Sequence, residues 1–519
     1  MPVVRGPQPG QQAWHRCCCQ RRAEVVAMRT VDLLVVAGYL FCMVAVGRYF
    51  ARRQRDSEDF FLGGRRMPAW AVAISVFASL ASTVGYLGDP GEIIRHGIGM
   101  FVRFGALPFY LAVTLWVIVP FFRRAGVTTV FEILEQRFGR STRLLGVGIW
   151  CYMQLAFLGL VLLLAARVIA QMTGVGEIYV ILAIGAASVL YTSAGGLQSV
   201  IWTDVIQFVF LFLGVLVTLV VIAAETGTGP RTWWLAVSGT THPLPPLVST
   251  DLATRHTILG ALIFGFVVNL SYNCSEQVVV QRYAATPRPV LMMLANYGAG
   301  VLFTLLQIAV GAALLVYYTR FPEALPEGVR DVTQAEFADD AFPDFIQYHL
   351  PVGLSGLVIA ALLGAAQSTM DSGVNSIAAV MARDVLPAFG YQQVAGNLQL
   401  ARWTTRGAGL GVLLMAILAG QLSNANNIID IAQKVVHLGL GPMGGLLLVT
   451  ILGLRGSALA ANTALLLGLA AALAGAFGDL VLGRPLLSPL LIIPVSWLVT
   501  LSAAPLLVLL SGGRLASRG

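Results

Sequence analysis

Polar residues gather inside a stretch of the chain that is otherwise apolar. Residues 364–376 read GAAQSTMDSGVNS, between the apolar runs GLVIAALL and IAAVMA. On a helix, a spacing of i, i+4, i+7 and i+8 places four of these side chains on one face: Ser368, Ser372, Asn375 and Ser376. Polar groups in a membrane cost on the order of a few kcal/mol each unless they have partners. We therefore expect this stripe to face protein, water or an ion.

The composition identifies the class of protein. Of 519 residues, 57% are hydrophobic and 11% are charged, whereas about a quarter of a soluble protein is charged. Apolar runs of about 20 residues recur from Val31 almost to the end of the sequence. The sequence shows no alternating ten-residue strand pattern, which a membrane barrel would require. We predict an all-α polytopic membrane protein.

The apolar runs predict about 13 transmembrane helices. Their approximate ranges are 31–50, 68–88, 100–121, 143–173, 177–193, 199–224, 256–284, 290–319, 351–382, 400–422, 427–453, 457–477 and 486–511.

The charges predict the orientation of these helices. The net charge of +8 would suggest a nucleic-acid partner in a soluble protein, but here it is better explained by arginines in cytoplasmic loops. The loops at 51–68 and 122–143 are rich in arginine, while the loop at 320–344 is acidic. We expect the acidic loop and the N-terminus outside, and a cytoplasmic tail at 512–519. No nucleic-acid partner is expected.

The first 27 residues differ from the rest. They are polar and rich in Arg and Gln, and they lack the apolar core of a signal peptide. We expect 1–27 to be a disordered or mis-annotated leader, and a single membrane domain to cover 28–511 from Met28. The leader holds Cys17, Cys18 and Cys19, which could carry lipid or metal, but no metal-binding spacing appears.

Two of the predicted helices are interrupted. The second contains ASLASTVGYLGDPG and the seventh contains NLSYNCSEQ. They lie five helices apart, and interrupted helices at matching positions of two halves point to an inverted-repeat transporter. We expect a first repeat at about 68–224 and a second at about 256–453, with extra helices at 31–50, 457–477 and 486–511.

Five motifs in order now give a family resemblance: DFFLGGRRMPAWAVAISVFASLAST, SAGGLQSVIWTDVIQFVF, NCSEQVVVQRY, STMDSGVNS and GPMGGLLL. From Met28 to about residue 455, the chain resembles the sodium:solute symporter family, which has a LeuT-like 5+5 inverted repeat with broken helices. The resemblance implies Na+-coupled symport of a small solute by alternating access. It also implies an integral protein of the bacterial inner membrane, with the lipid bilayer and the solute as partners and no obligatory protein partner.

The resemblance also implies a sodium site. Carried over by motif, its ligands are the carbonyls of Ala78, Ala81 and Ala365 and the hydroxyls of Ser368 and Thr369. The implied coupling ion is Na+, which binds well to uncharged oxygens, and a helix break supplies such oxygens as free backbone carbonyls. The alternative is that these small residues only allow close helix packing.

Three more residues form a possible second cation or proton site: Asp204, Asp371 and Ser372. Asp204 matches an aspartate that serves a second cation or couples protons in parts of the family, or it is a solvated carboxylate. Asp371 stands where many relatives carry a hydroxyl. It could bind a cation, carry a proton or bond to neighbouring helices.

The region around Lys434, the one lysine of the chain, is open to two interpretations. Asp430 precedes Lys434 by four residues, which favours an intrahelical ion pair over a solute-binding ammonium. His437 is better explained as a packing residue than as a proton relay.

The solute is expected between the two broken helices and the third predicted span. The candidate lining residues are Gly85, Tyr86, Phe104, Tyr272, Asn273 and Glu276. Sugar-transporting relatives carry polar side chains where Gly85 and Phe104 stand, and an amide where Glu276 stands, so a hexose is disfavoured. The motif wording resembles the branch for monocarboxylates, vitamins and iodide. Glu276 would repel an anion, so the two clues conflict.

Other function classes fit less well. The sequence has no HExxH motif or comparable catalytic cluster and no phosphate-binding loop, so we expect neither an enzyme nor an ATP-driven pump. A channel is disfavoured because the expected ion site lies inside a closed helix bundle and not in a symmetric pore. A solute sensor on the same fold and a proton-coupled carrier are the alternatives that remain open.

Overall fold

A computed structural model describes residues 30–238, 245–251, 254, 257–391, 397–422, 428–483 and 486–515. Residues 1–27, for which a leader is expected, lie outside the described residues. The side chains of Asp430, Lys434 and His437 are also outside the part of the chain that the structure describes.

The described residues are almost entirely helical. The elements of the first half are α2 (Thr30–Ala51), α3 (Ser57–Leu62), η1 (Gly63–Arg65), α4 (Ala69–Leu80), α5 (Thr83–His96), η2 (Gly99–Ala106), α6 (Leu107–Val113), η3 (Thr114–Ile118), α7 (Val119–Ala125), α8 (Phe131–Phe138), α9 (Arg140–Thr173), α10 (Glu177–Thr226) and α11 (Pro230–Val237). Those of the second half are α12 (Ile258–Ser275), α13 (Gln277–Ala285), α14 (Pro289–Arg320), η4 (Pro322–Ala324), α15 (Ala335–Ala338), α16 (Ala341–Asp344), η5 (Phe345–His349), α17 (Leu354–Val380), η6 (Met381–Val385), α18 (Leu386–Ala388), α19 (Leu398–Leu422), α20 (Ile428–Ile451), β1 (Leu454–Arg455), α21 (Ala458–Leu482), α22 (Pro489–Leu510) and β2 (Arg514–Leu515).

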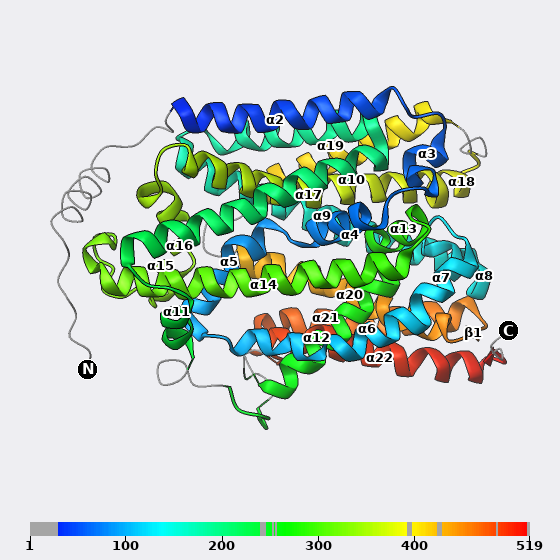
Figure 1. Cartoon of the computed structure of the whole chain (residues 1–519). Helices are drawn as coiled ribbons and strands as arrows, with labels where there is room; N and C mark the ends of the chain where they lie inside the picture. Colours follow the sequence, from blue (N-terminus) through cyan, green and yellow to red (C-terminus); the bar gives the residue numbers. More distant parts are fainter. Residues whose placement is uncertain are drawn as a thin grey trace.

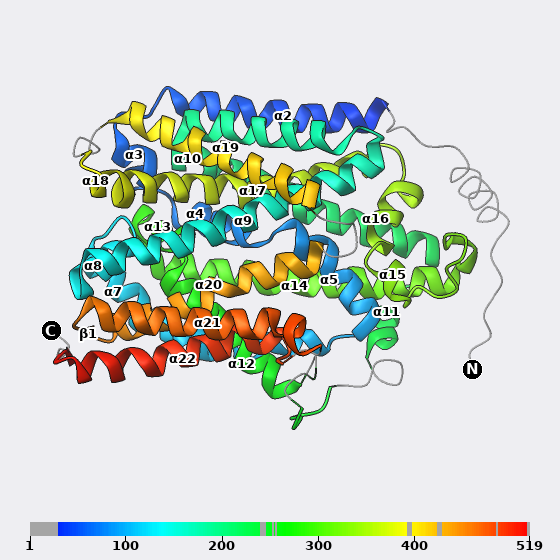
Figure 2. The same cartoon turned by 180° about the vertical axis from the view of Figure 1, so that it is seen from behind.

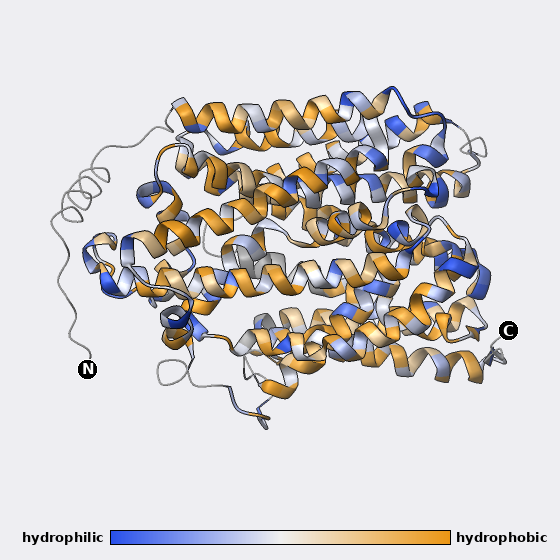
Figure 3. Cartoon of the chain, viewed as in Figure 1, coloured by the Kyte–Doolittle hydropathy of each residue, from blue (hydrophilic) through white to orange (hydrophobic). Residues whose placement is uncertain are grey.

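The long helices lie side by side along a common direction (Figure 1). The short helices α11, α15 and α16 gather at one end of this bundle, and α3, α8 and α18 gather at the other, where α22 ends (Figures 1 and 2). Hydrophobic residues cover the helix bodies, and hydrophilic residues concentrate at the two ends (Figure 3). This distribution is that of a protein whose middle lies in hydrocarbon.

Ten described helices are long and apolar enough to cross a membrane, or eleven if the bent pair of α4 and α5 counts as one span. The count of eleven is two below the thirteen expected spans for two reasons. The expected spans 177–193 and 199–224 both lie within α10 and count once, and the expected span 427–453 corresponds to α20, whose described apolar part, Leu438–Ile451, is too short to be counted.

The helix α10 reverses direction at Gly196. Tyr191 hydrogen-bonds to Asp371, and Ser372 hydrogen-bonds to Asp204. In an unbroken helix, the 13 residues from Tyr191 to Asp204 would span about 20 Å, yet both contact adjacent residues of α17. The backbone of Gly196 is non-helical, with φ 58° and ψ −157°. The two halves of α10 therefore form a hairpin, and each can cross the membrane.

The helix α17 forms the centre of the bundle. In its apolar stretch of 18 residues, 94% are buried inside the protein, whereas the corresponding share for the peripheral α2 is 22%. Its first turn is held by Asp32 of α2, whose Oδ1 accepts hydrogen bonds from the backbone N–H groups of Gly353 and Gly356, each 2.8 Å long. A carboxylate at a helix N-terminus satisfies backbone donors that otherwise lack partners. This contact fixes α17 against α2.

We predict that Gly196→Ala destabilises the protein. The φ and ψ of Gly196 fall in a region that is essentially restricted to glycine, where other residues cost about 1–3 kcal/mol. An added Cβ would also lie 2.6 Å from the carbonyl oxygen of Phe60. Thermal unfolding of the purified protein in detergent should show a lower midpoint. The matched control is Gly148→Ala in α9, whose Cβ would meet nothing within 4 Å; an equal effect of the two variants would contradict the hairpin geometry.

Candidate functional site

The first break separates α4 from α5, whose axes differ in direction by 64°. Ala81 leaves the helical conformation at ψ 74°, and Ser82 is extended. Small and hydroxyl-bearing residues on both sides, in ASLAST, permit the break because they need little room. A break of this kind frees backbone carbonyls that a continuous helix would use in its own hydrogen bonds.

The expected sodium ligands of α17 meet this break. The hydroxyl of Ser368 donates to the carbonyl of Ala78 at 2.9 Å and to that of Ala365 at 3.1 Å. The hydroxyl of Thr369 donates to the carbonyl of Ala365 at 3.1 Å. The structure thus brings four of the five expected oxygens together, all of them buried and uncharged. Ala81, the fifth expected ligand, lies at the break itself. This donor set suits a hard monovalent cation.

The second break separates α12 from α13 at Glu276. The backbone N–H of Glu276 donates to the carbonyl of Tyr272 at 3.1 Å and closes α12. The side chain of Glu276 accepts a hydrogen bond from the N–H of Val278 at 3.4 Å and caps α13. A carboxylate can cap the new helix because it replaces hydrogen bonds that the break removes. Glu276 is nevertheless only 3% exposed.

A cavity of about 50 Å³ lies between the two breaks. Residues from both interrupted helices line it, and α9, α17 and α20 complete the wall. The lining residues are Ser79, Leu80, Met153, Gln154, Phe157, Tyr272, Glu276, Val278, Thr369 and Leu440. Thr369 belongs also to the expected sodium site, so the cavity and that site are adjacent.

Of the six residues expected to line the solute site, Tyr272 and Glu276 line this cavity. Tyr86 packs instead against Phe342, and the carbonyl of Gly85 lies 3.4 Å from Gln307 Nε2.

Phe104 and Asn273 also lie elsewhere. Phe104 stacks on Phe101 in η2. Asn273 donates hydrogen bonds to Thr114 at 3.0 Å and to Tyr297 at 2.6 Å, and so joins α12 to η3 and α14. The expected third wall, the span at 100–121, does not line the described cavity.

The residues of α9 on this cavity were missed from the sequence. They are Met153, Gln154 and Phe157, and Phe157 lies four residues after Met153 and three after Gln154, so the three share one helix face. Gln154 is a buried polar residue within an otherwise apolar run. An intramembrane glutamine on an aromatic face is a signal that could have identified this wall.

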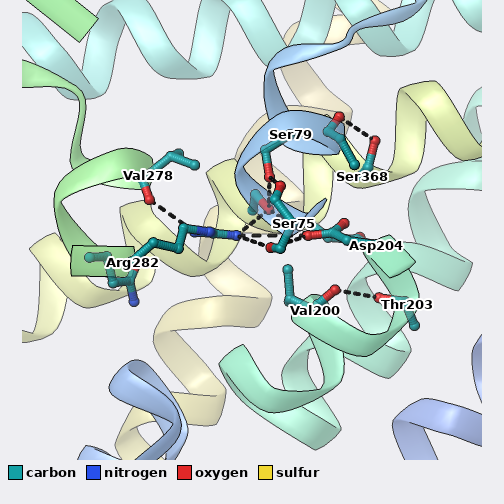
Figure 4. Close-up of polar contacts among 12 residues, drawn as sticks. Ser75, Ser79, Val200, Thr203, Asp204, Val278, Arg282 and Ser368 are labelled. Carbon is teal, nitrogen blue, oxygen red and sulfur yellow. Dashed lines mark hydrogen bonds and ion pairs between the residues drawn. The ribbon is translucent and has the colours of Figure 1, made fainter. Parts of the chain in front are cut away.

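A buried charge pair lies beside the expected sodium site (Figure 4). Arg282 of α13 and Asp204 of α10 both have fully buried side chains, and Arg282 Nη2 is 3.9 Å from Asp204 Oδ2. Hydroxyls connect the two charges: Ser75 donates to Asp204 at 2.5 Å, and Arg282 donates to Ser75 at 3.2 Å and to Ser372 at 2.6 Å. The sequence analysis did not include Arg282 in this site. Asp204 is a paired internal charge, not a solvated one.

Asp371 of α17 contacts the first half of α10. Its Oδ2 accepts a hydrogen bond from the hydroxyl of Tyr191, and its side chain is fully buried. Its Oδ1 has no hydrogen-bond partner among the described residues. Of the three roles considered for Asp371, a bond to a neighbouring helix is present in this structure.

Comparison with known proteins identifies the family. The model of the sodium:solute symporter family matches residues 60–468. The chain belongs to this family. The symporter is 32% identical over 457 residues to the sodium/sialic acid symporter NanT of Aliivibrio fischeri, covering 85% of this chain and 86% of that protein. It is 29% identical to the human sodium-coupled monocarboxylate transporter 1, covering 85% and 72% of the two chains.

Solved structures agree with this assignment. A substrate-bound, outward-open Na+-coupled sialic acid symporter superposes with a TM-score of 0.80 at 25% identity, covering 94% of the symporter and 100% of that chain. The nucleobase-cation-symport-1 transporter Mhp1 superposes with a TM-score of 0.56 at 14% identity over 88% of the symporter and 95% of Mhp1, which supports the LeuT-like fold alone. The protein is therefore a Na+-coupled solute symporter and not an enzyme.

We predict that Asp204→Asn and Arg282→Gln each destabilise the symporter strongly. Removal of one partner leaves the other charge buried without compensation, which costs about 3–5 kcal/mol. The double variant should lose less stability than the sum of the two single losses. Thermal or denaturant unfolding of the four proteins measures this coupling. The partly exposed pair of Arg65 and Glu58 provides the control, where each single loss should stay within about 1 kcal/mol. Additive losses at Asp204 and Arg282 would contradict a direct pair.

Proposed function

We propose that Na+ binds between the α4–α5 break and α17, at the carbonyls of Ala78, Ala81 and Ala365 and the hydroxyls of Ser368 and Thr369. The observation that carries this proposal is the contact of Ser368 with the carbonyls of both helices, at 2.9 and 3.1 Å. Five uncharged oxygens suit Na+ because they replace its water ligands without fixing it by a full opposite charge. Ions can therefore bind and leave during each transport cycle.

Transport then proceeds by alternating access between two inverted five-helix repeats, at about 68–224 and 256–453. The position of the breaks supports this proposal, because each lies in the first helix of its repeat and both border the same cavity. Na+ bound at Thr369 holds α4, α5 and α17 together beside the solute. By linkage, Na+ and the solute then raise each other's affinity by the same factor.

The solute is a small organic molecule that binds in the cavity between the breaks. The sequence favours a monocarboxylate- or vitamin-like solute over a sugar, and relatives are named for sialic acid, monocarboxylates and multivitamins. A solute sensor on the same fold would bind solute without coupling it to Na+. A proton-coupled carrier would use a carboxyl such as Asp371 in place of the Na+ site.

The orientation follows from charge. The arginine-rich loops at 51–68 and 122–143 would lie in the cytoplasm, and the acidic loop at 320–344 would lie outside. The N-terminus would then be outside and the C-terminal tail cytoplasmic, in a bacterial inner membrane. A membrane potential would add about 2.3 kcal/mol per charge per 100 mV to inward movement of Na+.

We predict that the double variant Ser368→Ala/Thr369→Ala responds to Na+ only at concentrations at least tenfold higher than the wild type. The variant lacks two of the five ligands. The measurement is the rise in unfolding temperature as Na+ replaces K+ at constant ionic strength, which needs no knowledge of the solute. The control is Thr405→Ala, which removes a buried hydroxyl that donates to the carbonyl of Ala401 in its own helix, 2.8 Å away. An unchanged Na+ response in the double variant would refute the assignment.

We predict that a membrane-impermeant maleimide labels Glu327→Cys in intact cells but labels Arg123→Cys only after the membrane is permeabilised. Glu327 lies in the acidic loop and Arg123 in an arginine-rich loop. The parent protein measures the background from its own cysteines. The reverse pattern would invert the proposed topology.

A further inference from the structure

The cavity between the two breaks has an acidic side chain in its wall and no basic one among the described residues. Of the described residues that line it, Glu276 alone has an ionisable acidic or basic side chain; four are polar and uncharged (Ser79, Gln154, Tyr272 and Thr369) and the rest are apolar. No described lining residue is Arg, Lys or His. A carboxylate-bearing solute would therefore bring a second acidic group beside the buried Glu276. Like charges at such a site repel strongly.

The carboxylate of Glu276 is held but not neutralised by its neighbours. Its Oε2 accepts a hydrogen bond from the indole N–H of Trp150 at 3.2 Å, and its Oε1 accepts one from the N–H of Val278 at 3.4 Å. Both donors are uncharged. A carboxylate has about four acceptor sites, so each oxygen retains capacity for a ligand. No ion pair within 4.0 Å involves Glu276 in the described part of the chain.

The nearest basic residue on the same helix is committed elsewhere. Arg282 of α13 binds Ser75, Ser372 and its own helix carbonyl at Val278 and pairs with Asp204. Its guanidinium makes its close contacts with Asp204 and the hydroxyls, and it does not line the cavity. A cationic solute would give Glu276 a counter-charge within the cavity itself.

The remaining walls suit an organic cation. Phe157 of α9 and Tyr272 of α12 contribute aromatic rings, and Met153 adds a polarisable thioether. Aromatic rings attract ammonium groups through their negative faces, and the attraction strengthens when the cation is desolvated. A carboxylate with two aromatic rings is the combination that recognises an alkylated ammonium, because the rings contact its carbon atoms while the carboxylate balances its charge. Gln154 can bind a hydroxyl elsewhere on such a solute.

We propose that the solute of this symporter carries a positively charged nitrogen, bound by Glu276 between Phe157 and Tyr272. This inference rests on the proposed solute site between the two breaks. The proposed solute differs from the solutes for which the relatives are named, because the acidic wall of this cavity selects against an anion. Glu276 is the specificity-determining residue, and Trp150 is the positioning residue that orients its carboxylate.

The test uses the purified full-length symporter and a panel of probes. Choline, glycine betaine and tetramethylammonium represent charged nitrogen; pyruvate, sialic acid and glucose represent anions and neutral sugar. Each is added in Na+ and in K+ buffer, and the unfolding temperature is measured. We expect at least one ammonium probe to stabilise the protein in Na+ and much less in K+, with no comparable effect of the other three. Uptake of that probe into proteoliposomes should require a Na+ gradient.

Variants separate the solute charge from the Na+ site. Glu276→Gln should weaken binding of the ammonium probe at least tenfold. Na+ alone should raise the unfolding temperature of this variant as much as that of the wild type, because Glu276 is not a proposed Na+ ligand. Glu276→Asp should retain part of the affinity. The exposed Glu58→Gln is the control and should change neither response.

Three outcomes would overturn the inference: Na+-dependent stabilisation by pyruvate or sialic acid without any by ammonium probes, no stabilisation by any ammonium probe, or unchanged ammonium affinity in Glu276→Gln. In the first case Na+-coupled symport would stand and only the solute class would fail. Binding of an ammonium probe that is equal in Na+ and K+ would support the solute class and contradict the proposed coupling. If Glu276→Gln does not fold, the wild-type panel still decides the solute class.

Discussion

Backbone hydrogen bonding in a medium without water is the constraint on which this structure depends. Each interruption of a transmembrane helix frees N–H and C=O groups that lipid cannot satisfy. The symporter resolves this by placing both interruptions inside the bundle, against α17 and α9. At the first break, Ser368 supplies a donor to a carbonyl of α4; at the second, Glu276 supplies an acceptor to α13. The groups that complete the fold are thus the groups that can hold an ion and a solute.

The second constraint is the arrangement of charge. Arg282 is wholly buried and bonds to residues of α4 and α17 while it pairs with Asp204 of α10. A single guanidinium thereby connects three helices with α13. A charge in such a position tolerates little displacement, because any movement that separates it from Asp204 leaves two buried ions without partners. This region is therefore expected to move as one body while other parts of the bundle rearrange.

The sequence predicted the apolar spans, both helix breaks and the polar face of α17, because each depends on local composition and periodicity. It could not predict which side of each break faces the cavity. Asn273 was expected beside Tyr272 and Glu276, but it bonds to Thr114 and Tyr297 on neighbouring helices. The wall from α9 was missed, since its partners are distant in sequence. The contacts of Arg282 could not be predicted either, because a periodic pattern describes one helix at a time and not the contacts between helices.

The hairpin in α10 has a consequence for how the protein is inserted during synthesis. Its two halves and their turn at Gly196 contain no Lys or Arg over 50 residues, so the turn lacks the basic residues that favour a cytoplasmic position for a loop. The turn instead packs against earlier parts of the chain, with Gly195 near the carbonyl of Gly47 in α2 and Gly196 against Phe60 in α3. Contacts with α2 and α3, which are synthesised before the hairpin, therefore fix the turn where basic residues do not.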